Sequence, residues 1–93
     1  MEYVLYTFDS TSFAEACKIE VQSHDIDARL VPVFGAIKAG CGLMLKSPFE
    51  NLEKINEIIK ENDLKIDGIY KAIYSIDKGC AFKPPTIEVI EYL

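Results

Sequence analysis

The sequence predicts an α+β fold, a ferredoxin-like βαββαβ sandwich in which two helices cover one face of an antiparallel four-stranded sheet. Short runs rich in β-branched and aromatic residues alternate with two segments of helical periodicity, in the order β-α-β-β-α-β. The chain has 93 residues, of which 49% are apolar, and this suits one domain with a modest core. We expect residues 1–75 to form the ferredoxin-like domain and residues 76–93 to be a C-terminal extension of the same unit that can add a strand.

The first strand and the first helix follow from residue types near the N-terminus. Residues 2–8 are rich in aromatic and β-branched types and predict a strand. Ser12 and Glu15 fit a capping box for the helix that follows, and Ser10 is an equally good N-cap. The helix is expected to run to about Ser23. Its predicted buried side carries five residues: Phe13, Ala14, Ala16, Cys17 and Val21.

Two strands flank a loop with several glycines in the middle of the chain. Residues 27–33 predict a strand, and Pro32, which cannot donate to a β-ladder, favours a position at the edge of the sheet. The loop from residue 34 to about Gly42 follows, and residues 43–46 predict the short third strand. The end of this loop therefore lies directly before a strand of the sheet.

The second helix has a clear predicted start. Ser47 fits an N-cap, Pro48 fits the first helical position, and Glu50 completes a Ser-x-x-Glu capping box. The predicted buried side of this helix carries Phe49, Leu52, Ile55 and Ile59. Residues 69–75 predict the fourth strand, and residues 86–93 alternate in the manner of a strand.

Charge and composition exclude several functional classes. Ten basic residues against fifteen acidic ones give a net charge of -5. We therefore expect no binding to nucleic acid or to an anionic membrane, because both require clustered lysine and arginine. No apolar stretch is long enough to span a bilayer, and the N-terminus lacks the pattern of a secretory signal peptide.

Cys17, Cys41 and Cys80 are the candidate reactive residues. Their odd number and wide spacing argue against a disulfide framework and favour the cytoplasm. No CxxC pair is present and His24 is the single histidine, so we expect no metal site. The glycine spacing matches no phosphate-binding loop, and we expect no cofactor. Cys17 falls on the predicted buried side of the first helix and suits a core position.

Cys41 stands between Gly40 and Gly42, directly before the predicted third strand. Glycine on each side removes the neighbouring side chains and allows the backbone conformations of a tight turn. A partner molecule should therefore be able to approach this thiol. The plainer alternative is an ordinary loop cysteine in a glycine turn, since cysteine is among the residue types most often buried.

The predicted topology gives Cys41 a neighbourhood. The loop that carries it should share one end of the sheet with residues 9–12 and with residues 62–68. The free N–H groups at the start of the first helix would favour a thiolate there, and Lys38 would add positive charge. The residues expected to support the thiol are Gly40, Gly42, Ser10, Thr11 and Lys38.

Five stretches share the pattern of a known family: the first strand ending in Phe8, the helix start at 10–11, the strand at 28–33, Gly-Cys-Gly-Leu at 40–43, and Gly-Ile-Tyr at 68–70. Over about residues 3–75 the chain thus resembles the selenium/sulfur (Se/S) carrier protein-like family. The resemblance implies that Cys41 carries sulfur or selenium as a persulfide-type adduct, with donor and acceptor proteins as partners. Ala39 departs from the family pattern, which often has a small polar residue there.

Two other functions stay open. The strands are apolar on both faces while the helices cover one, so the chain could be a non-catalytic binding or regulatory module that forms a homodimer through the open sheet face. The C-terminal extension could cover that face instead. Alternatively, Cys80 could pair with Cys41 as a redox couple. Whether the chain is an enzyme stays open; a carrier or binding protein is favoured because no histidine is predicted near Cys41 to activate it.

Overall fold

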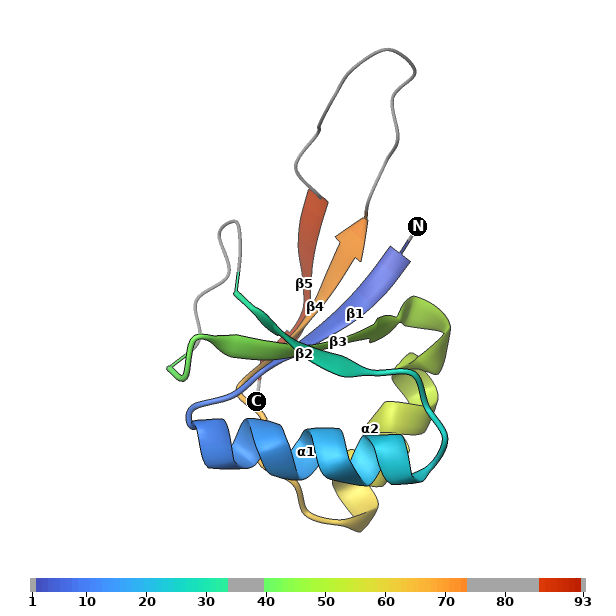
Figure 1. Cartoon of the computed structure of the whole chain (residues 1–93). Helices are drawn as coiled ribbons and strands as arrows, with labels where there is room; N and C mark the ends of the chain where they lie inside the picture. The colour runs from blue at the N-terminus through green and yellow to red at the C-terminus, as the bar shows by residue number, and fades with distance from the viewer. Residues whose placement is uncertain (1, 34–39, 74–85, 93) are drawn as a thin grey trace.

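A five-stranded antiparallel sheet forms one layer of the molecule, and two helices cover one of its faces (Figure 1). The computed structural model describes residues 2–33, 40–73 and 86–92, and for residues 86–92 it describes the backbone alone. The strands are β1 (Glu2–Thr7), β2 (Arg29–Pro32), β3 (Leu43–Pro48), β4 (Gly68–Ile73) and β5 (Thr86–Tyr92). Their order across the sheet is β2-β3-β1-β4-β5.

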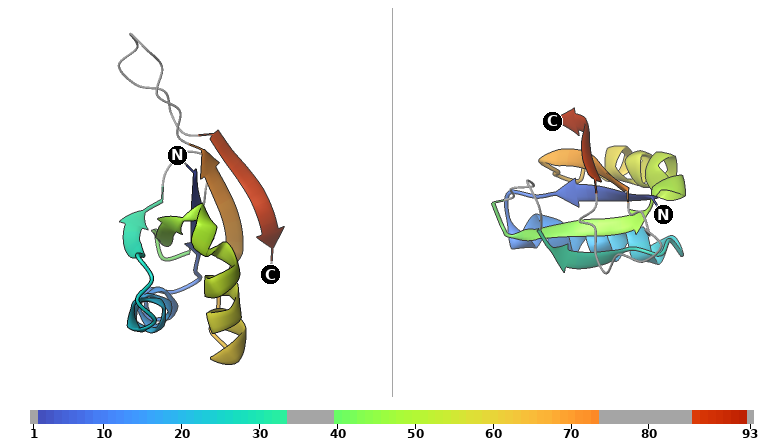
Figure 2. Two further views of the ribbon diagram at one scale, coloured as in Figure 1. Left: turned by 90° about the vertical axis from the view of Figure 1, so that its right-hand side faces the viewer. Right: turned by 90° about the horizontal axis from the view of Figure 1, so that it is seen from above.

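The predicted α+β ferredoxin-like arrangement is confirmed. β1 lies in the centre and pairs antiparallel with β3 on one side and with β4 on the other. β2 pairs with β3 at one edge of the sheet. An edge strand tolerates Pro32, which has no backbone N–H to donate to a neighbouring strand. β5 pairs antiparallel with β4 and adds a fifth strand, with Thr86 opposite Ile73. The second view in Figure 2 shows β5 beside β4 at the other edge.

Helix α1 (Thr11–Ser23) begins at Ser10, not at Ser12. The Ser10 hydroxyl oxygen accepts a hydrogen bond from the Phe13 backbone N–H at 3.3 Å, which satisfies one of the free donors of the first turn. Of the five residues predicted to be buried, Ala14, Cys17 and Val21 are buried. The prediction was wrong for Phe13 and Ala16, which are exposed: Ala16 lies on the side of the helix opposite Ala14 and Val21, and Phe13 lies in the first turn.

The predicted start of the second helix is wrong. Ser47 and Pro48 belong to β3, a 3₁₀ turn (Phe49–Asn51) follows, and helix α2 spans Leu52–Glu61. The Ser47 hydroxyl is buried and donates to the backbone carbonyl of Asp27 at 2.6 Å, while accepting from the Asn51 amide at 3.0 Å. This serine therefore joins β3 to the segment before β2 instead of capping a helix.

Apolar side chains form a cluster on each face of the sheet. The helix-face cluster joins strands and helices and contains Val4, Tyr6, Phe8, Ala14, Cys17, Val21, Ala28, Leu45, Ile55, Ile58, Ile59 and Ile69. The open-face cluster is smaller and contains Leu5, Met44, Tyr70 and Ala72. Within the part of the chain that the structure describes, no helix is long and apolar enough to cross a membrane.

Candidate functional site

Gly40, Cys41 and Gly42 form a tight turn that leads into β3. Gly42 has φ +74°, a left-handed conformation that glycine adopts without the steric cost other residues incur. Its carbonyl accepts a hydrogen bond from the Val33 backbone N–H at 3.1 Å, just beyond the end of β2. The turn is thereby fixed to both strands of the β2–β3 pair.

Gly40 holds this turn against the connection between β1 and α1. A Cβ atom at Gly40 would lie 2.8 Å from the Asp9 carbonyl oxygen, so only glycine fits this approach without a shift of the backbone. The loop that enters β4 reaches the same end of the sheet, where the Asp67 N–H donates to the Thr7 carbonyl at 2.7 Å. The topology predicts that the Cys41 loop, residues 9–12 and residues 62–68 are neighbours. In the described residues these three segments do lie at one end of the sheet.

The Cys41 thiol lies at the boundary between the core and solvent. The residue is half-buried and packs against the helix-face cluster, while the glycines on each side are exposed. Its Sγ–H donates a weak hydrogen bond to the Leu43 carbonyl at 3.4 Å. The sulfur is therefore held in one orientation, next to backbone that carries no side chain on either side.

The residues predicted to support the thiol lie in different places. The Ser10 hydroxyl is engaged with the first turn of α1, and Thr11 is exposed at the first helical position. Within the described residues, neither hydroxyl makes a hydrogen bond to Cys41. Lys38 lies outside the described residues. A supporting role for these three residues stays a prediction.

The environment of Cys17 differs from that of Cys41. Cys17 is fully buried in the helix-face cluster, and burial raises the pKa of its thiol to about 12. A thiol in that state is a poor nucleophile at neutral pH, which fits the core position that its helical spacing predicts. Cys80, the predicted alternative partner of Cys41, lies outside the described residues.

Alkylation of the folded protein should therefore discriminate between Cys41 and Cys17. In a Cys80→Ser background at neutral pH, we expect iodoacetamide to modify Cys41 at least about 100-fold faster than Cys17, since the thiolate and its exposure set the rate. Peptide mapping by mass spectrometry at successive times measures both rates. The same reaction in denaturant should modify both residues at similar rates. Equal rates in the folded protein would contradict the placement of Cys17 in the core.

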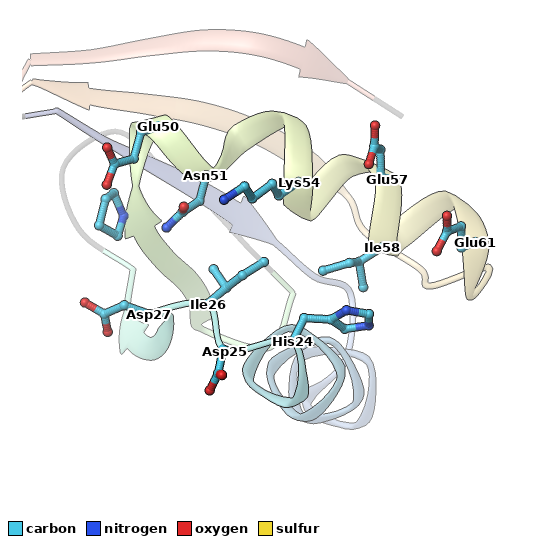
Figure 3. Close-up of a pocket in the computed structure, with 11 residues that line it drawn as sticks. His24, Asp25, Ile26, Asp27, Glu50, Asn51, Lys54, Glu57, Ile58 and Glu61 are labelled. Carbon is cyan, nitrogen blue, oxygen red and sulfur yellow. The ribbon is translucent and has the colours of Figure 1, made fainter.

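One hollow in the described part of the chain lies away from Cys41. It is a groove of about 630 Å³ between α2 and the segment that joins α1 to β2 (Figure 3). His24, the C-cap of α1, lines it, so the groove and the Cys41 turn lie at opposite ends of a helix that is roughly 20 Å long. The carboxylates that line it are Asp25, Asp27, Glu50, Glu57 and Glu61.

This groove adds no catalytic group to the thiol. His24 was predicted to be distant from Cys41, and its place at the far end of α1 agrees with that. Within the described ranges, no group of three or more histidine, cysteine, aspartate or glutamate side chains is placed to hold a metal ion.

A family model described as "Putative Se/S carrier protein-like" matches residues 3–71, about three quarters of the chain, and includes the whole Cys41 turn. The chain belongs to the Se/S carrier protein-like family. No curated protein and no solved structure gives a match. The region shared with the Se/S carrier protein-like family runs from β1 into β4, so β5 lies beyond it.

Two features of this Se/S carrier protein-like chain are not evident in its sequence. Asp9 contributes a backbone carbonyl against which Gly40 packs, and a contact to backbone leaves no signature in residue type. Phe13 is 41% exposed although its spacing suggests burial.

Proposed function

We propose that Cys41 is a carrier thiol that accepts sulfur or selenium from a donor protein and passes it to an acceptor enzyme. The observation that supports this most is the half-buried, glycine-flanked thiol within the segment matched by the Se/S carrier family model. A carrier needs a nucleophilic sulfur that two successive proteins can reach, and bare backbone on both sides of Cys41 leaves room for both. A carrier of this kind suits a reducing compartment such as the cytoplasm.

The transfer is a balanced exchange at sulfur. The Cys41 thiolate attacks the outer sulfur of a donor persulfide, the bond from Cys41 Sγ to that sulfur forms, and the S–S bond of the donor breaks. The donor leaves as a thiolate with the electron pair of the broken bond, and Cys41 becomes the persulfide. Attack by an acceptor thiolate on the outer sulfur reverses these steps and regenerates Cys41. With selenium as the outer atom the same exchange forms a selenopersulfide, and no oxidant or reductant is consumed.

Intact mass spectrometry tests this proposal directly. The protein is isolated without reductant and also incubated with cysteine persulfide as a small-molecule donor. We expect wild type and Cys17→Ala to gain the mass of one or more sulfur atoms, which reductant removes, and Cys41→Ser to gain none. Cys17→Ala is the matched control, because it also removes one thiol, but a buried one that should not be loaded. Equal loading of Cys41→Ser, with Cys80→Ser unloaded, would move the carrier role to Cys80 and refute the proposal.

No described feature favours the alternative of a binding module that dimerises through the open face of the sheet. Leu5, Met44 and Ala72 of the open-face cluster have no exposed area in the single chain. A homodimer would gain little by covering side chains that are already buried. The dimer and the Cys41–Cys80 redox pair both stay predictions.

A further inference from the structure

Two positively charged residues lie directly opposite each other on the open face of the sheet. Arg29 of β2 and Lys46 of β3 are partners across the β2–β3 pair, which forms one edge of the sheet (Figure 1). Lys46 is in turn opposite Leu5 of the open-face cluster, so these three positions share that face. Like charges at directly opposite positions destabilise a sheet. An anion bound between Arg29 and Lys46 would remove that repulsion.

The two side chains line a hollow of about 210 Å³. The Tyr3 ring forms part of its wall and lies 4.3 Å from the Lys46 ammonium, a cation–π contact that keeps this charge beside the hollow. Ser47 and Pro48 also line it, and the Ser47 hydroxyl is already bonded to the backbone carbonyl of Asp27. Pockets for drug-sized ligands have volumes of roughly 300–1,000 Å³, so this smaller hollow suits a small ion.

Arg29 favours an anion that has several oxygen atoms. Of the ten basic residues in the chain, it is the one arginine. A guanidinium group can donate two parallel hydrogen bonds to two oxygens of one group, which a lysine ammonium cannot do. The Lys46 ammonium, on the facing strand, can donate to a third oxygen. The arrangement of donors therefore matches a tetrahedral oxyanion better than a halide ion.

Asp27 is the group in the hollow that opposes an anion. Its carboxylate lies 3.9 Å from the Arg29 guanidinium, and both side chains are 74% exposed. An exposed ion pair of this kind contributes little, so Asp27 does not hold Arg29 strongly against a competing anion. The hollow thus has two positive side chains and one negative one, in a chain whose net charge is -5.

We propose that this hollow, here named the Arg29 hollow, binds a free tetrahedral oxyanion of the sulfate or phosphate class. Arg29 holds two oxygens of the anion and Lys46 holds a third, beside the Tyr3 ring. The site is separate from the carrier thiol, because Cys41 precedes the start of β3 and Lys46 lies in the second half of that strand. The proposal does not depend on the role of Cys41.

A titration of the full chain with sodium sulfate tests the proposal. Sulfate keeps one charge across the neutral pH range, and sodium chloride holds the ionic strength constant, so general screening does not change during the titration. Two-dimensional ¹H–¹⁵N NMR follows the backbone amides of Arg29 and Lys46. We expect the shifts of both amides to saturate in the millimolar range with one common midpoint.

Conservative variants separate a specific site from general attraction to positive charge. Arg29→Lys keeps the charge but loses the two parallel donors, so it should bind sulfate at least about fivefold more weakly. Asp27→Asn removes the opposing carboxylate but keeps the backbone carbonyl that Ser47 bonds, and it should bind at least about threefold more tightly. Lys60→Gln removes an exposed charge from α2 and should leave the midpoint within about twofold of wild type.

Three results would overturn the proposal. The first is a wild-type shift that stays proportional to the sulfate concentration, and the second is an equal midpoint in wild type and Arg29→Lys. The third is tighter binding of glycerol 1-phosphate than of inorganic phosphate, which would assign the hollow to a phosphate ester and not to the free anion. None of these results bears on the carrier role, because loading of Cys41 is measured separately by mass.

Discussion

Raising the pH above about 9 should destabilise the protein steeply, because two buried groups must stay protonated in the folded state. Burial raises the pKa of the Cys17 thiol from its ordinary value of 9.0 to about 12. Burial, with a smaller contribution from Cys17, also raises the pKa of the Tyr6 hydroxyl well above its ordinary value of 10.0. The Tyr6 hydroxyl is held as a donor to the Asn56 side-chain oxygen at 2.9 Å, a bond that the ionised form could not make.

The sign follows from which state loses its protons first. Both folded pKa values lie above the unfolded ones, so the stabilisation is complete below about pH 9 and is lost as the pH rises, when the unfolded chain releases protons that the folded chain keeps. Each group should contribute a slope of about 1.4 kcal/mol per pH unit above its ordinary pKa, or about 2.7 kcal/mol for both together. For a domain of this size such a slope removes most of the stability within a few pH units.

Urea unfolding followed by circular dichroism, with reductant present, measures this free energy between about pH 7 and about pH 11. Cys17→Ala and Tyr6→Phe should each remove about half of the alkaline slope, and the double variant should remove nearly all of it. At neutral pH this slope is absent. The free energy of unfolding of each variant should there differ from that of wild type only through the changed packing and hydrogen bonding. A wild-type free energy of unfolding that is constant across this range would contradict the burial of both groups.

Replacing the two glycines beside Cys41 should have unequal effects. Gly40→Ala places a Cβ atom 2.8 Å from the Asp9 carbonyl oxygen, and because that atom is backbone it cannot turn aside. We expect this variant to lower the free energy of unfolding by about 2 kcal/mol and to displace the turn from the β1–α1 connection. Gly42→Ala meets no atom within 4 Å, and its cost comes from the φ of +74° alone. We expect Gly42→Ala to lower the free energy of unfolding by about 1 kcal/mol, with the turn still packed against Asp9.

Two measurements distinguish these outcomes. Urea unfolding gives the loss of stability, and the rate of Cys41 alkylation relative to wild type reports whether the sulfur has left the boundary of the core. Gly40→Ala should raise that rate, since its displaced turn no longer packs against the helix-face cluster. If Gly40→Ala proved as stable as wild type and equally reactive, the close approach of Gly40 to Asp9 would be disproved.

The order of elements carried most of the information about the fold. Helical and alternating periodicity located both helices and the strands, and the rules of chain connection then placed the loop of Cys41 at one end of the sheet with residues 9–12 and 62–68. The error at Ser47 shows what such patterns lack. Ser-Pro-x-Glu is a good local signal for a helix start, yet the partner of this hydroxyl is the carbonyl of Asp27, twenty residues earlier. A bond over that separation leaves no trace in the local sequence.

For the candidate site, the sequence predicted the location but not the exposure of the side chains. The glycines pointed to Cys41, and the topology pointed to its neighbours at one end of the sheet. What the sequence could not supply was the exposure of each group. Cys17 and Phe13 were both assigned to the buried side of α1, but Cys17 is fully buried while Phe13 is 41% exposed. These two residues are four apart and so share one side of the helix, and spacing alone does not distinguish the exposed one in the first turn from the buried one.

The central place of β1 in the sheet has a consequence for how the chain folds. Its two neighbours come from much later in the sequence, since Val4 faces Ser47 of β3 and Lys71 of β4. Every pairing of the first strand is thus non-local, and such topologies have a high contact order and fold slowly. During synthesis at about 5–20 residues per second, β1 must wait several seconds for β4. In that interval a strand that is apolar on both faces lacks one of its two partners, and such an unpaired strand edge favours aggregation of the newly made chain.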